Sequence, residues 1–94
     1  MARLEPLTDL EASERLTRLS GWQIDGGRLT KRFGFGDFMG AVDFVNQIAR
    51  VAETQRHHPD LEVGWGRVVV TLMTHSAGGL TDKDFGLAAL IEAL

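Results

Sequence analysis

The side chains best suited to acid/base chemistry in this sequence are its three histidines, His57, His58 and His75. An imidazole has an unperturbed pKa of about 6.5, so it can accept or donate a proton near neutral pH. All three histidines fall in predicted connections between secondary-structure elements, where functional side chains concentrate. The sequence therefore offers a proton-transfer site, provided that the fold brings these connections together.

The His57-His58-Pro59 loop also has two simpler interpretations. As a solvated helix end, it would place an imidazolium near the negative end of a helix dipole. As a metal site, three neutral imidazoles could bind zinc and leave an open position, although the chain contains no HxH, HxxxH or HExxH spacing. From the residues alone the solvated helix end is the simplest interpretation, and the other two stay open.

Four further residues are candidates only in combination with the histidines. Glu53 precedes His57 by four positions on a predicted helix and would ordinarily be an exposed acid. Asp84 stands in the first turn of the last predicted helix, where a carboxylate favours the helix dipole. Trp65, between two glycines at a turn, and Trp22, before a strand, could each pack or could stack on a flat ligand.

Composition limits the class of protein. A chain of 94 residues is expected to form one domain, spanning 1–94, with a small core that association with further copies would enlarge. The net charge of -3 argues against nucleic-acid binding, and the absence of cysteine excludes disulfides and thiolate chemistry. Residues 1–6 lack the apolar core of a signal peptide, and no segment is apolar enough to span a membrane, so a cytoplasmic location is the expectation.

Hydrophobic periodicity and turn signals predict the order αββαββα. A capping box at Thr8 and Glu11 begins the first helix, whose expected apolar stripe contains Leu10, Leu16 and Leu19. This order favours an α+β fold, with a four-stranded antiparallel sheet covered by three helices on one face. The apolar arc of the segment 38–52 is wider than one sheet contact needs, which suggests a second packing partner. The predicted ranges are helices 8–21, 38–55 and 81–94, strands 22–25, 28–35, 61–64 and 67–74, and a loop at 75–80.

The spacing of the candidate residues resembles the motif of the pterin-4a-carbinolamine dehydratase family. Further similarity extends through Gly21-Trp22, Phe33-x-Phe35, Asp37-Phe38 and Gly79-Leu80-Thr81, so that it covers nearly the whole chain. A pattern of seven fixed positions is far more specific than a lone His-His-Pro. The motif in this chain is Glu53-x3-His57-His58-Pro59-x5-Trp65-x9-His75-x8-Asp84.

The resemblance implies dehydration of 4a-hydroxytetrahydropterin to quinonoid dihydropterin, a step that recycles the cofactor of aromatic amino acid hydroxylases. It implies His57 and His75 as the acid/base pair and His58 as the residue that holds the substrate. Glu53, Asp84, Trp22 and Trp65 would then be substrate-binding or supporting residues. Family members need no metal or redox cofactor and form homodimers or homotetramers. The alternative on the same fold is a non-catalytic dimerisation or co-activator module, which would not need the histidines.

Overall fold

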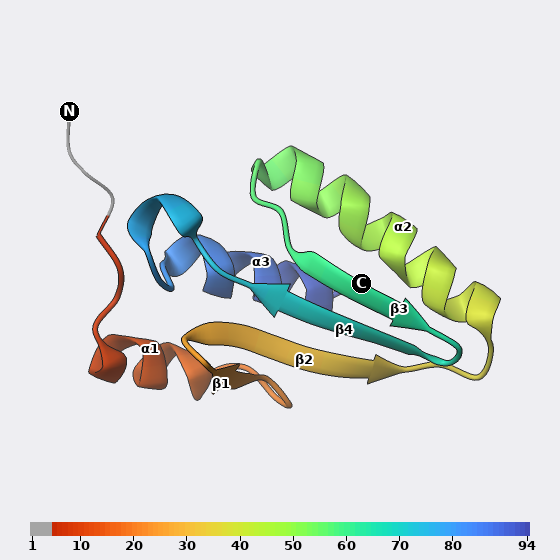
Figure 1. Cartoon of the computed structure of the whole chain (residues 1–94), viewed down its shortest axis with the longest axis horizontal. Coiled ribbons are helices and arrows are strands. Elements are labelled where there is room, and N and C mark those ends of the chain that lie inside the picture. Colours follow the sequence, from red (N-terminus) through yellow and green to blue (C-terminus); the bar gives the residue numbers. More distant parts are fainter. Residues whose placement is uncertain (1–4) are drawn as a thin grey trace.

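The computed structural model describes residues 5–94 and confirms the predicted order of elements (Figure 1). Residues 1–4, part of the segment examined above for a signal peptide, lie outside the described residues. In chain order the elements are α1 (Asp9–Leu16), β1 (Gln23–Asp25), β2 (Arg28–Gly34), α2 (Phe38–Gln55), β3 (Asp60–Gly64), β4 (Arg67–Leu72), the short 3-10 helix η1 (His75–Ala77) and α3 (Asp82–Glu92).

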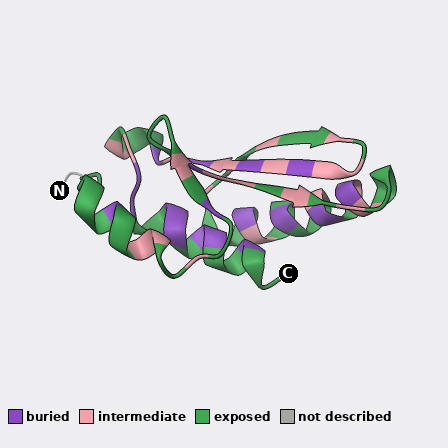
Figure 2. Cartoon of the chain, turned by 90° about the horizontal axis from the view of Figure 1, so that it is seen from below, coloured by how far each residue is buried: buried purple, intermediate pink, exposed green. Residues whose placement is uncertain are grey.

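The sheet is antiparallel throughout, with the strand order β1-β2-β4-β3. Strand β4 is central, and its Val68, Val70 and Leu72 are fully buried while the residues between them are only half-buried. This period of two places one face of the sheet against the core. Figure 2 shows the helices on that side of the sheet, which confirms the predicted α+β architecture.

Helix α2 crosses the sheet and carries the chain to the candidate site. The Asp37 carboxylate begins it by accepting a hydrogen bond of 2.7 Å from the Gly40 backbone N–H. Its buried residues recur at helical spacing and form the face that packs on β3, β4 and α3. These residues are Ala41, Phe44, Ile48 and Ala52.

Helix α3 begins with a capping box and is buried along much of its length. The Thr81 side chain accepts from the first turn, and the Asp84 carboxylate accepts from the Thr81 backbone N–H. The buried apolar side chains Leu87 and Ile91 belong to the hydrophobic core, where α3 packs beside α2. The capping box therefore fixes the position of Asp84, one of the candidate site residues.

The predicted end of the first helix was wrong, whereas the other predicted bounds differ from the structure by at most two residues. Helix α1 ends at Leu16 rather than near Gly21. Just after Leu16, the Thr17 hydroxyl donates to the Glu14 carbonyl, and this hydrogen bond competes with continuation of the helix. Leu10 is exposed and does not join the expected apolar stripe, whereas Leu16 and Leu19 pack partly on the core. Within residues 5–94, no helix combines the length and apolar character that crossing a membrane requires.

Candidate active site

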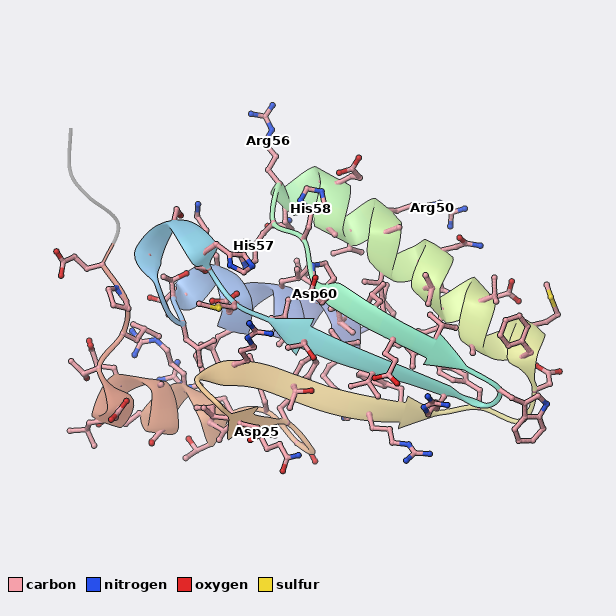
Figure 3. The ribbon with its side chains drawn as sticks, viewed as in Figure 1. Asp25, Arg50, Arg56, His57, His58 and Asp60 are labelled. Carbon is pink, nitrogen blue, oxygen red and sulfur yellow. The ribbon has the colours of Figure 1, made fainter. Side chains whose placement is uncertain are left out.

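The candidate site lies at the end of the sheet where α2 leads into β3 and where β4 leads into α3 (Figures 1 and 3). A pocket of about 300 Å³ opens there, at the lower end of the range for small-molecule sites. Its walls come from three separate parts of the chain, and they include all three histidines. The lining residues are Arg56, His57, His58, Met73, Thr74, His75, Ser76 and Lys83.

The first wall follows from the way in which α2 ends. Arg56 adopts the left-handed conformation (φ 52°, ψ 39°), and its N–H bonds to carbonyls of the last helical turn. This reversal turns the next residues out of the helical path. Glu53 therefore meets His58 rather than His57, with 2.5 Å between Oε2 and Nε2. Both side chains of this pair are exposed.

His57 is held much more firmly than His58. Its Nε2 lies 2.6 Å from Oδ1 of Asp84, and the two side chains are 12% and 0% exposed. An ionised Asp84 only accepts hydrogen bonds, so with this carboxylate in its charged form Nε2 of His57 is the donor in the contact. That tautomer leaves Nδ1 as the nitrogen of His57 that is available for proton exchange.

Asp84 is itself fixed by a buried chain of hydroxyl groups. Its Oδ2 accepts from the Thr74 hydroxyl at 2.7 Å and from the Thr81 backbone N–H at 3.0 Å. The hydroxyl of Thr81 lies 2.8 Å from that of Thr74 and accepts from the Lys83 backbone N–H. Asp84 is thus both the capping acid of α3 and the anchor of His57, one carboxylate oxygen serving each role.

The imidazole of His75 lies in a different environment from those of the other two histidines. His75 is the first residue of η1, in a loop closed by the bridge between Thr74 and Gly79. Its side chain is exposed and makes no hydrogen bond within residues 5–94. Because Thr74 is bonded to Asp84, the residue that precedes His75 is tied to the same carboxylate that anchors His57.

The two tryptophans do not line this pocket. Trp22 is 5% exposed, belongs to the core and donates from Nε1 to Oε1 of Glu92 at 2.8 Å. Trp65 is 73% exposed in the β3–β4 turn, at the opposite end of the sheet from the histidines (Figure 1). Contact between either tryptophan and a substrate therefore stays a prediction, without support from the geometry of a single chain.

Sequence reasoning did not identify several residues that complete the site. The sequence could have indicated Thr74 and Thr81, because they flank the loop that carries His75 and because Thr81 caps the helix that carries Asp84. No sequence feature indicated a role for Lys83, Arg56 or Ser76, since exposed polar residues in loops and first turns are common. Their presence at the pocket depends on the three-dimensional arrangement of α2, η1 and α3.

The described residues do not gather the ligands of a metal centre. Across residues 5–94, no group of three or more histidine or carboxylate side chains is placed so that it could hold one ion. The three histidines share a pocket, but two of them are each paired with a carboxylate. The arrangement is suited to proton transfer by imidazoles whose orientation is set by acidic partners.

Comparison with known proteins identifies the family of the chain. The family model described as "Pterin 4 alpha carbinolamine dehydratase" matches residues 5–94. A relative from Nostoc sp. is 46% identical over all of this chain and 99% of its own length. One from Thermosynechococcus vestitus is 48% identical over 98% of this chain and 94% of its own length. Both carry the name "Putative pterin-4-alpha-carbinolamine dehydratase". The chain therefore belongs to the pterin-4a-carbinolamine dehydratase family.

Two solved structures share the fold. A transcriptional coactivator/pterin dehydratase from Brucella melitensis superposes with a TM-score of 0.89 at 42% identity, covering 95% of this chain and 97% of that one. A pterin dehydratase-like protein, described as a RuBisCO assembly factor in the alpha-carboxysome, superposes with a TM-score of 0.66 at 28% identity. The second match covers 78% of this chain and 87% of the other. The same fold thus occurs in proteins described by enzymatic and by protein-binding roles.

Proposed function

We propose that this protein dehydrates a pterin-4a-carbinolamine, 4a-hydroxytetrahydropterin, to quinonoid dihydropterin and water. The observation that carries the proposal is that His57, His58 and His75, from two connections far apart in sequence, line one pocket. The family to which the chain belongs supports the reaction class.

The reaction needs one proton delivered and one removed. The C4a–O bond breaks, and its electron pair leaves with the hydroxyl oxygen, which takes up a proton and departs as water. The lone pair of the adjacent ring nitrogen forms the C=N bond, and that nitrogen loses its proton to a base. The dehydration is redox-neutral, and a positioned acid/base pair contributes roughly 10² to 10⁴-fold to such a step.

The environments of the histidines suit different parts of this reaction. His57, fixed by Asp84, presents Nδ1 in a constant orientation. His75 is exposed and can exchange its proton with solvent between turnovers. We assign these two residues as the acid/base pair, and His58, held by Glu53 at the rim, as the residue that holds the substrate. Glu53 and Asp84 are positioning residues in this assignment.

Self-association and protein binding form a second candidate role. Four large apolar side chains are exposed at the end of the sheet remote from the pocket, on the start of α2 and around the β3–β4 turn. Exposed apolar side chains that gather on one part of a surface are typical of interaction sites. This observation favours a homodimer or homotetramer, or a co-activator module on the same fold. The four residues are Phe38, Met39, Val63 and Trp65.

A direct assay tests the proposed reaction. 4a-hydroxytetrahydropterin is generated in a stopped-flow instrument, and its decay is followed with and without the protein. We expect acceleration that is proportional to protein concentration and is reduced at least about tenfold in His75→Ala, whose exposed side chain is not part of the core. Equal decay rates with and without protein would reject the enzyme and favour the protein-binding role.

A further inference from the structure

We propose that the pocket selects pterins whose side chain carries a phosphate ester. This inference rests on the proposed function and names the class of substrate that the same pocket prefers. Its basis is the charge of the pocket wall. The eight lining residues include two permanent cations, Arg56 and Lys83, together with three histidines and no acid, in a protein whose net charge is -3.

Neither cation is neutralised by a neighbouring carboxylate. Among residues 5–94, the ion pairs of the protein leave out both Arg56 and Lys83. Acids adjoining the lining residues already have partners: Asp84 is paired with His57, Glu53 with His58 and Asp82 with Arg15. Two free positive charges at one pocket attract an anion, and the field is stronger in a concave site than on an open surface.

The position of Lys83 is unfavourable for its own helix. It lies in the first turn of α3, immediately after Thr81 and Asp82, where the helix dipole favours an anion and disfavours a cation. Asp82 and Asp84 stand in the same turn, and the capping box occupies its N–H groups, so the positive charge at the pocket wall is that of the Lys83 side chain itself. A bound phosphate would be favoured by this ammonium group, and the hydroxyl of Ser76, which also lines the pocket, provides a further hydrogen-bond donor.

The cations occupy the rim of the pocket. Arg56 extends from the end of α2 away from the body of the protein (Figure 3), whereas His57 is mostly buried beside Asp84. A neutral pterin ring at the histidines would direct its side chain toward solvent and therefore toward this rim. An arginine and a lysine with a nearby hydroxyl suit a phosphate group, because guanidinium and ammonium groups donate charge-assisted hydrogen bonds to its oxygens.

Equilibrium binding of two stable oxidised pterins tests the proposal without requiring turnover. One carries a hydroxymethyl side chain and the other the phosphate ester of the same side chain, and pterin fluorescence reports binding. We expect the phosphate ester to bind at least about tenfold more tightly at low ionic strength, with the preference shrinking in about 0.5 M salt. The preference should also shrink in Lys83→Gln and Arg56→Gln.

Arg50→Gln is the matched control, since Arg50 is an exposed arginine on α2 that does not line the pocket. It changes the net charge by the same amount as Arg56→Gln and should keep the wild-type preference. Equal affinity for the two pterins would overturn the inference, as would a preference that Arg50→Gln reduces as much as Lys83→Gln does. Dehydration of the neutral carbinolamine, measured separately, decides the proposed function whichever of these results is found.

Discussion

The Nε2 atom of His57 lies 2.6 Å from Oδ1 of Asp84, and the Asp84 carboxylate has no solvent exposure. All of its hydrogen-bond partners are donors: His57, the Thr74 hydroxyl and the Thr81 backbone N–H. One buried carboxylate therefore sets the orientation of His57, the position of the residue before His75 and the start of α3.

Replacing Asp84 by asparagine should impair both the site and the fold. The asparagine amide can no longer accept from all three donors, because its nitrogen must face one of them. We expect the dehydration rate to fall at least about tenfold and the free energy of unfolding to fall by about 1–3 kcal/mol. Stopped-flow assays and urea titrations measure these changes.

Asp82→Asn is the control for this variant, since Asp82 lies in the same helical turn but is exposed. It removes the same charge from the start of α3 without touching the buried network. A rate for Asp82→Asn as low as that for Asp84→Asn would contradict the assigned role of Asp84 and indicate a general effect of helix charge.

The Thr74 hydroxyl should act through Asp84 as a positioning group. Thr74→Val keeps the shape of the side chain but removes one donor to Asp84 and one partner of Thr81. We expect lower kcat with a smaller change in KM, and a loss of about 1–3 kcal/mol in the free energy of unfolding. Thr74→Ser, which restores the hydroxyl, should recover most of kcat and most of the free energy of unfolding. If Thr74→Ser recovers neither, the packing of the Thr74 methyl group matters instead of its hydroxyl.

Truncation of the two tryptophans should change the free energy of unfolding by very different amounts. Trp22→Ala removes a core residue and a hydrogen bond to Glu92, so it should cost about 3–5 kcal/mol of unfolding free energy. Trp65→Ala removes an exposed ring and should change that quantity by less than about 0.5 kcal/mol. Denaturant titrations at several protein concentrations make the comparison. A cost for Trp65→Ala that depends on protein concentration would reveal that a second copy covers this residue.

The capping box of α1 predicts a pH dependence of stability. The hydrogen bond from the Thr8 backbone N–H lowers the pKa of the Glu11 carboxyl below its ordinary value. A depressed pKa in the folded state stabilises the fold above the unfolded-state pKa, and this contribution is lost as pH falls through the folded-state value. The stability advantage of the wild type over Glu11→Gln should therefore shrink between about pH 7 and about pH 3. A constant difference over that range would refute this contribution.

Local sequence signals predicted much of the fold. The helical spacing of Ala41, Ile48 and Ala52 and the alternation in β4 appear in the structure as buried faces, and Phe44, predicted at the margin of the apolar arc, is buried with them. The boundaries of α1 were less accurate, because a single hydroxyl contact at Thr17 competes with the helix. Periodicity reports which face is buried, but it does not report where such local competition ends an element.

The pairing of acids with histidines could not be read from spacing. Glu53 is four residues before His57, which on a continuous helix would favour that pair, yet the left-handed turn at Arg56 directs His58 to Glu53 instead. The partner of His57 comes from α3, 27 positions away, through tertiary packing alone. The sequence thus indicated the members of the site, and the fold determined which of them touch.

The central claim is that His57 and His75 act together as the acid/base pair of a pterin dehydratase. Its most direct test is the stopped-flow dehydration rate of 4a-hydroxytetrahydropterin for the wild type, His57→Gln, His75→Ala and the double variant. The glutamine amide can still donate to Asp84, and thermal unfolding checks that each variant is folded. We expect each single variant to lose at least about tenfold in rate, and the double variant to lose far less than the product of the two single losses. Wild-type rates in both folded single variants would contradict the central claim.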